Sequence, residues 1–377
     1  MRPARQWRVD VRAALPGWLV ARALVGLALV VAWFVRHHTG LHLPYTARFG
    51  RRGLLGWDAD WYESLARHGY AGTISLRRGT GLEALRFFPL LPLLARLLGV
   101  VTGVSAALLL LGNVPALGLG AAVHRLTLHE TGDGAAARRA AALVALAPPA
   151  FVLAMGYTEA IAVASLAVAL LCLRRRQWWW AALFGVVCGL ARPTGLLLGL
   201  PALIEALRGV RAVPARELVA RASAVVAPAV GAVAYLLWVR GVYGDWYLPY
   251  RVQQVAGLRG HTVDPLVTVA RAVSGLATGH VGTDAHYVWV LVLLALLVPT
   301  VRALPPSLAA LGVATVVVAL AAQHLGSLER YAWGSVVLVV AVAIVSRGRR
   351  ASRWVPALSG LAMGTYATLA FLGYYVP

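Results

Sequence analysis

The stretch GWDADWYESLARHGY, residues 56–70, sets three carboxylates among aromatic side chains in an otherwise apolar chain. An ionised carboxylate at a membrane surface can take a proton from a hydroxyl group and so act as a general base. If a helix has already begun here, Asp58 and Asp60 lie about 200° apart around it and cannot both face one site. The stretch therefore offers one catalytic carboxylate, and the competing interpretation is a solvated polar group.

Spacing predicts different roles for the two aspartates. Asp60 and Glu63 have the separation of a capping box, with Asp in place of Ser or Thr, so Asp60 is expected to cap the helix. Asp58 is then left just ahead of the helix without a local partner and becomes the candidate base. Trp57 and Trp61 begin an apolar stripe at helical spacing, which favours a helix at the membrane surface with its tryptophans at headgroup level.

The composition is that of a membrane protein. Hydrophobic residues make up 60% of the 377 residues and charged residues 13%, against roughly half and about a quarter in soluble domains. Apolar runs recur along the whole length, and a helix of about 20 apolar residues crosses a bilayer. We predict an all-α polytopic membrane protein, residues 1–377 forming one domain. Membrane lipids rather than nucleic acid are the expected partners of its formal charge of +21.

Arginine placement orients the spans. Arg8 and Arg12 precede the first apolar run, which lacks a cleavage site, so we read it as a signal anchor with the N-terminus in the cytoplasm. Later arginine clusters predict further cytoplasmic ends. About eleven transmembrane helices are expected, at 17–35, 104–124, 140–173 and 178–207 (two short helices each), 222–239, 286–303, 307–322, 331–346 and 354–374.

The predicted topology gathers unusual polar groups on one side. The runs 140–173 and 178–207 are interrupted by GYTE (156–159) and ARPTG (191–195), and both interruptions fall on the extracytoplasmic side. The same side receives two long outer segments, 36–103 with its interfacial helices and 240–285. Broken helices are tolerated in membranes where they border a cavity. We therefore expect one outward-facing cavity.

Charged residues at membrane depth are costly and point to function. Arg192 of ARPTG and Arg330 of SLERY are candidates for binding an anionic phosphate, because arginine is always charged and binds phosphate bidentately. The alternative for each is a snorkelling arginine at a helix end. Glu159 either contacts substrate or orients a helix. Further candidate substrate-binding residues are Trp57, Tyr62, Tyr157 and His68.

Five motifs carry a family resemblance. WDADWYESLARHGY, RFFPLLPLLARLL, GYTEAIAVASLAVALL, LARPTGLLLGLP and SLERYAW resemble, in the same order, the bacterial relatives of the PIG-V mannosyltransferases. That family belongs to the GT-C glycosyltransferases, polytopic enzymes that take sugar from a polyprenyl phosphate on the outer face. The resemblance implies a GT-C-like bundle, a plasma-membrane location and Asp58 as the catalytic base. GYTE stands where the family usually has PYTE.

The resemblance implies transfer of mannose from polyprenyl-phosphate-mannose to an envelope acceptor such as a glycolipid, with inversion. No histidine-rich motif indicates a required metal and no cofactor is expected, although Asp58 with Glu159 leaves a divalent ion open. Another lipid-linked sugar is an alternative donor. A lipid or solute transporter, or a flippase, is the alternative from another class, but it would often show inverted repeats, which the sequence lacks.

Overall fold

The computed structural model describes residues 3–76, 82–210, 213–255, 258–375 and 377. Residues 77–81 and 256–257, which belong to the two predicted outer segments, lie outside this part. Within the described ranges the regular structure is helical, apart from one isolated antiparallel bridge between Thr262 and Ala322. The prediction of an all-α protein is confirmed.

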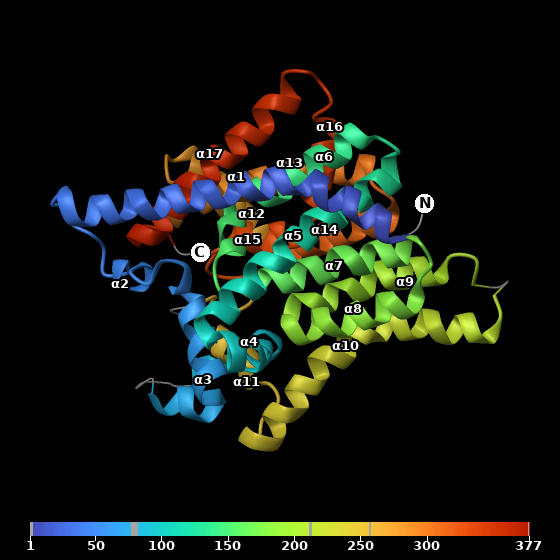
Figure 1. The fold of residues 1–377 in the computed structure, drawn as a ribbon, viewed down its shortest axis with the longest axis horizontal. Coiled ribbons are helices and arrows are strands. Elements are labelled where there is room, and N and C mark those ends of the chain that lie inside the picture. Colours follow the sequence, from blue (N-terminus) through green and yellow to red (C-terminus); the bar gives the residue numbers. More distant parts are fainter. Residues whose placement is uncertain (1–2, 77–81, 211–212, 256–257, 376) are drawn as a thin grey trace.

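The first half of the chain contains the longest helix and the helices that carry the first candidate residues. α1 (Pro3–His38) runs across the molecule in Figure 1 and packs on α5, α6 and α17. The following elements are α2 (Ala47–Gly50), η1 (Gly53–Leu55), α3 (Asp58–Leu76), η2 (Leu82–Arg86), α4 (Leu90–Thr102), α5 (Val104–Thr131), α6 (Gly134–Leu146), η3 (Pro148–Ala154) and α7 (Glu159–Arg174).

The second half continues with shorter helices. Its elements are α8 (Trp178–Ala191), η4 (Pro193–Leu198), α9 (Gly199–Leu207), α10 (Ala215–Tyr243), α11 (Leu248–Gln253), α12 (Pro265–Ala277), η6 (Thr283–Ala285), α13 (His286–Ala303), α14 (Pro306–Leu320), α15 (Leu328–Trp333), α16 (Val337–Val345) and α17 (Ala351–Leu372). The predicted breaks at GYTE and ARPTG are confirmed, since α7 begins at Glu159 and α8 ends at Ala191.

Five described helices are long and apolar enough to cross a membrane, namely α1, α5, α10, α13 and α17. A sixth span results if α6 and η3, which are bent by 73°, count as one. The protein is therefore a multi-pass membrane protein. The predicted count of about eleven is not confirmed, because helices such as α8 (14 residues) and α16 (9 residues) are shorter than the roughly 20 residues that a span needs.

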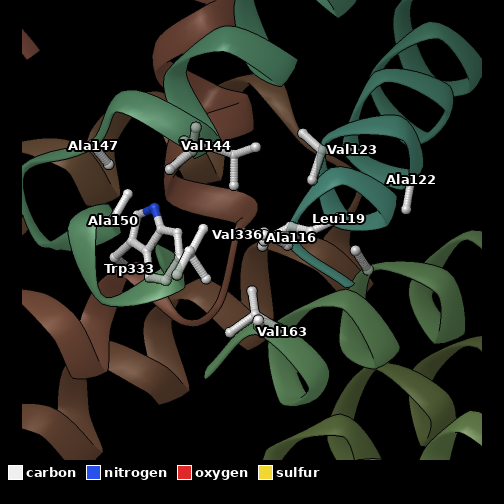
Figure 2. Packing of buried hydrophobic residues seen from close by; sticks show 14 of the residues in the cluster. Ala116, Leu119, Ala122, Val123, Val144, Ala147, Ala150, Val163, Trp333 and Val336 are labelled. Atoms are coloured by element: carbon white, nitrogen blue, oxygen red, sulfur yellow. The ribbon is translucent and has the colours of Figure 1, made fainter. Parts of the chain in front are cut away.

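The predicted span 331–346 is two helices in the structure. α15 ends at Trp333 and α16 begins at Val337, and Val336 between them has φ +55°, a left-handed conformation that β-branched residues rarely adopt. The side chain of Val336 is fully buried beside Trp333, within the core shown in Figure 2. Gly334 and Ser335 are the local sign of this break, but apolar residues continue on both sides of them.

The core is built from small side chains that let helices approach closely. Ala116, Leu119 and Val123 of α5 face Val144 of α6 and Val163 of α7 (Figure 2). α8 and α10 cross at glycines: a Cβ atom added at Gly189 would collide with the Pro228 carbonyl, and one at Gly231 with the Val186 carbonyl. Small residues at helix crossings are typical of membrane proteins, where van der Waals packing drives helix association.

One end of the bundle holds a set of buried ion pairs. Glu205 accepts hydrogen bonds from Arg174 (2.7 Å), Arg208 (3.3 Å) and Ser307, and Arg174 also donates to Glu130 (2.8 Å). We call these five residues the Glu205 cluster. A second buried set joins α1 and α5: Asp10 accepts from Arg125 (2.5 Å) and lies 2.7 Å from His124. Helix ends predicted to share one side of the membrane are thus in contact.

Candidate active site

Asp58 is the first residue of α3, and the turn before it is strained. Trp57 has φ +57°, a region that bulky residues avoid. Its indole N–H donates to the Ala370 carbonyl of α17 (3.0 Å), while the Asp58 backbone N–H donates to the Tyr157 hydroxyl (3.2 Å). The start of α3 is therefore tethered to α17 on one side and to the GYTE turn on the other, and this fixes the position of the Asp58 carboxylate.

The capping-box prediction is wrong. α3 begins at Asp58, so Asp60 lies inside its first turn, where its carboxylate pairs with Arg52 instead of capping the helix. Glu63 accepts from Arg52, from Arg67 (2.9 Å) and from Ser105 (2.5 Å). The predicted divergence of the two aspartates does hold, because Asp58 and Asp60 contact different arginines.

The surroundings of Glu63 perturb its titration. Burial acts to raise the pKa of the carboxyl, but hydrogen bonds from Ser105, Arg67 and Arg52 outweigh it and lower the pKa to about 2. Glu63 is therefore ionised at neutral pH and joins α3 to the start of α5. It belongs to the support of the site, because its partners are distinct from those of Asp58.

Two predicted arginines meet at Glu159, the first residue of α7. Arg330 Nη1 donates to Glu159 Oε1 (2.9 Å), and Arg192 Nη1 pairs with the same oxygen. Arg192 occupies the break between α8 and η4, whereas Arg330 lies on the short helix α15. The carboxylate of Glu159 is only 2% exposed. This burial favours the orienting role for Glu159 over direct contact with a substrate.

Asp58 completes the same cluster and remains accessible. Arg330 Nη1 also donates to Asp58 Oδ2 (3.1 Å), and Arg86 Nη2 lies 3.6 Å from Asp58 Oδ1. The Asp58 side chain is 25% exposed. Arg330 thus links the buried carboxylate of Glu159 to the accessible carboxylate of Asp58. We call Asp58, Arg86, Glu159, Arg192, Arg259 and Arg330 the Asp58 cluster.

Arg86 and Arg259 are the members that the sequence analysis missed. Arg86 ends η2 and is the first residue of the motif RFFPLLPLLARLL. Its place in a family motif could have indicated that it belongs to the site. Arg259 lies in the second outer segment, with its guanidinium 4.2 Å from the ring centroid of Tyr331. Arg192 (5.2 Å) and Arg330 (5.4 Å) approach the same ring. Nothing local in the sequence marks Arg259.

The remaining predicted residues divide into two groups. Tyr157 is fully buried, with Arg330 5.4 Å from its ring centroid. Tyr62 is buried against Phe87, and this burial, followed by the charge of Glu159, raises the pKa of its phenol well above the ordinary value. His68 is not brought to the cluster: it is exposed ten residues further along α3, about 15 Å from Asp58 at 1.5 Å per residue, and its Nδ1 contacts the Ser64 carbonyl (3.2 Å).

The arrangement suits an anionic ligand. Arg86, Arg192 and Arg330 contact the two carboxylates, and Arg259 lies against the Tyr331 ring beside them, so the cluster holds two more positive than negative charges. Buried charges normally occur in pairs, so an excess of one sign favours a counter-charge from outside the chain. Among the described residues, no group of three or more His, Cys, Asp or Glu side chains is placed to hold a metal ion.

Solved structures share this architecture. A crystal structure of ArnT from Cupriavidus metallidurans bound to undecaprenyl phosphate matches 92% of this chain and 63% of its own, with a TM-score of 0.50 and 16% sequence identity. The protein has a GT-C-like fold. This chain therefore spans a little under two thirds of the length of ArnT.

Two structures of an Archaeoglobus fulgidus oligosaccharyltransferase also match. The apo form gives a TM-score of 0.46 at 15% identity, covering 94% of this chain and 56% of that one. The complex of AglB with an inhibitory peptide and a dolichol-phosphate gives 0.42 at 13% identity, covering 94% and 55%. No family model and no curated protein sequence matches this GT-C-like chain.

Proposed function

We propose that this protein is a glycosyltransferase that moves mannose from polyprenyl-phosphate-mannose to a glycolipid or other envelope acceptor. Mannose and the PIG-V assignment derive from the sequence motifs. The lipid phosphate donor is supported by the excess of arginine in the Asp58 cluster and by the fold shared with ArnT, whose structure contains undecaprenyl phosphate. The arginine distribution supports a bacterial plasma-membrane protein with a cytoplasmic N-terminus and an extracytoplasmic active site.

The accessible carboxylate carries the proposal. Asp58 and Glu159 share Arg330, but Asp58 is 25% exposed and Glu159 only 2%. A base must reach the acceptor hydroxyl, so Asp58 fits that role and Glu159 fits the positioning of Arg192 and Arg330. Two carboxylates in one cluster thereby take two roles because their environments differ.

The proposed reaction is a direct displacement. The acceptor oxygen attacks the anomeric carbon while Asp58 takes the hydroxyl proton, and the bond between that carbon and the phosphate oxygen breaks. The departing polyprenyl phosphate gains negative charge, which Arg86, Arg192 and Arg330 are placed to stabilise. Attack opposite the leaving group inverts the configuration at the anomeric carbon.

The test compares neighbouring aspartates. Asp58→Asn removes the base, and Asp60→Asn is the matched control because Asp60 faces Arg52. Transfer from polyprenyl-phosphate-mannose in isolated membranes should fall about 10³-fold for Asp58→Asn, within the range for general-base catalysis, and stay near wild type for Asp60→Asn. Wild-type transfer by Asp58→Asn at normal expression would refute the role of Asp58.

Turnover also separates the alternatives. A transporter or flippase would move lipid without forming a glycosidic bond, so the absence of transferred sugar at any donor concentration would favour that class. Competition between polyprenyl-phosphate-linked mannose, glucose and arabinose would identify another donor sugar. Inhibition of mannose transfer by a second sugar donor that is itself consumed would contradict the preference for mannose.

A further inference from the structure

An open surface cavity with several polar side chains lies at the turn between α12 and α13. It measures about 800 Å³ and is lined by Arg271, Ser274, Thr278, His280 and Tyr287, together with glycines of the connecting turn. None of its lining residues belongs to the Asp58 cluster, and no carboxylate occurs among the described ones. Its volume falls within the range of about 300–1,000 Å³ typical of small-molecule sites.

The cation of this cavity has no partner among the residues that the structure describes. The Arg271 guanidinium is exposed and makes no ion pair or hydrogen bond with any described residue. By contrast Arg251, also exposed in the same outer segment, lies 2.9 Å from Asp245. Beside this cation Thr278 Oγ1 lies 3.2 Å from His280 Nδ1, which holds the imidazole at the cavity.

The turn that closes the cavity is compact. Tyr287 packs its ring against Gly275 and Gly282, where an added Cβ would lie 2.5 Å and 3.1 Å from ring carbons. Gly279 and Gly282 have φ +80° and +73°, conformations that glycine adopts without strain. The opening is therefore shaped by backbone and one aromatic ring, with polar side chains on one wall.

α12 presents two exposed stripes of different character. Leu266, Ala270, Val273 and Ala277 follow each other at i, i+4, i+7 and i+11, and all four are exposed although apolar. The neighbouring stripe contains Arg271, Ser274 and Thr278, which line the cavity. An exposed apolar stripe beside a polar, basic one is the pattern of a helix that lies in the membrane interface.

The position of the cavity agrees with that pattern. α13 is one of the membrane-spanning helices and begins at His286, directly after the turn that lines the cavity. The entrance of a spanning helix lies at headgroup level. Arg271 and His280 are therefore placed at the depth of lipid phosphates, with the apolar stripe of α12 toward the acyl region.

We propose that this cavity binds the phosphodiester headgroup of an anionic glycerophospholipid of the surrounding bilayer. The Arg271 guanidinium supplies a bidentate, charge-assisted contact to the phosphate oxygens. The hydroxyls of Ser274 and Thr278 and the His280 ring supply polar contacts on the same wall. This site is separate from the proposed donor site and does not depend on the proposed function.

Native mass spectrometry of the full chain tests the site. The protein in detergent is titrated with phosphatidylglycerol, and binding is compared between wild type, Arg271→Gln and the control Arg251→Gln. The affinity for the most tightly bound phosphatidylglycerol should fall about tenfold in Arg271→Gln, because one charge-assisted contact is lost. The affinity of Arg251→Gln should equal that of wild type. Unchanged binding to Arg271→Gln, or an equal loss in both variants, would overturn the proposal.

A competition arm distinguishes the lipid source. Polyprenyl-phosphate-mannose added to the wild-type complex should leave this phosphatidylglycerol bound. Its displacement from wild type, with no such effect in Arg271→Gln, would assign the cavity to the sugar donor and overturn the assignment to a bilayer lipid.

Spin labelling tests the placement of α12 independently. A nitroxide at Val273→Cys should be more accessible to oxygen than to a water-soluble nickel chelate in phosphatidylglycerol vesicles, and the reverse should hold for a control label at Gln254→Cys, which is exposed. The two native cysteines, Cys172 and Cys188, are buried and should not react. Preferential access of nickel at position 273 would place α12 in water and refute the interfacial site.

Discussion

The two ends of α7 lie in clusters of charged residues that differ in their charge balance. Glu159 begins this 16-residue helix inside the Asp58 cluster, and Arg174 ends it inside the Glu205 cluster. In the Glu205 cluster two carboxylates meet two arginines and one hydroxyl, so the charges balance. In the Asp58 cluster three arginines contact two carboxylates, and a fourth, Arg259, lies against the Tyr331 ring beside them.

The difference teaches how to separate structural from functional ion pairs in a membrane protein. Each carboxylate of the Glu205 cluster is at most 8% exposed, and its charge is satisfied within the chain. The Asp58 cluster retains an accessible carboxylate and uncompensated positive charge. Balanced pairs connect helices, whereas an imbalance beside an accessible carboxylate suits the outside anion that we propose.

The sharpest way to break this comparison is Arg330→Gln. Arg330 is the residue that bridges Asp58 and Glu159, so its loss should reduce sugar transfer about 10³-fold, the upper range for removing one group that stabilises transition-state charge. Initial rates in membranes, normalised to expression, provide the measurement. Arg330→Lys keeps the charge but loses the planar guanidinium, so its transfer rate should lie between those of wild type and Arg330→Gln. Equal rates for all three proteins would show that the bridge is structural.

The corresponding substitution at the other end of α7 should affect stability instead. Glu205→Gln leaves Arg174 without one of its two carboxylates and should lower the free energy of unfolding by about 3 kcal/mol, as expected when a buried ion pair is broken. Thermal unfolding in detergent measures this effect. The transfer rate per folded molecule should not change. Asp245→Asn is the control, since its partner Arg251 is 63% exposed, and it should cost less than about 1 kcal/mol.

Acid should weaken the support of the Asp58 cluster through Glu63. The carboxyl titrates near 4.3 in an unfolded chain and near 2 in the folded protein, so the folded state binds fewer protons. Its stabilising contribution is present above about pH 4.5 and is lost as the pH falls toward 2. The drop in melting temperature between pH 7 and pH 3.5 should therefore be smaller for Glu63→Gln than for wild type. An identical drop would contradict the lowered pKa.

The smallest effect is expected for Arg208→Gln. Arg208 is 47% exposed and contacts Glu205 at 3.3 Å, three residues away on the chain. Exposed pairs of this kind contribute about 0.5 kcal/mol, and the contribution decreases with salt. Unfolding at low and high ionic strength measures it. A decrease in the free energy of unfolding as large as that of Glu205→Gln would show that the exposed Arg208 stabilises the Glu205 cluster as much as the buried Glu205 does.

The sequence predicted those features that depend on local pattern and on sidedness. The helical class, the span 286–303, the breaks at 156–159 and 191–195, and the meeting of Asp58 with Arg330 are all present. These features follow from apolar run length, from Gly and Pro interruptions and from arginine placement. Their agreement explains why residues 272 positions apart could be assigned to one site.

The remaining features depend on contacts between distant segments. Asp60 has the spacing of a cap, but Arg52 is available to pair with it, and an earlier helix start at Asp58 removes the need for that cap. Arg259 reaches Tyr331 because the chain around His261 pairs with Gln323, whose N–H donates to the His261 carbonyl (3.1 Å). Tertiary pairings of this kind leave no periodic trace in a single sequence.

The glycine crossing of α8 and α10 limits which substitutions position 189 can tolerate. Gly189 stands three residues before Arg192, and its missing side chain lets the two helix backbones touch. One extra methyl group there would push α8 outward and carry the guanidinium of Arg192 away from Glu159. Substitution of Gly189 is therefore limited by the position of Arg192, a residue that Gly189 does not contact. A variant without this glycine should lose activity as an active-site variant does, although all of its polar residues are intact.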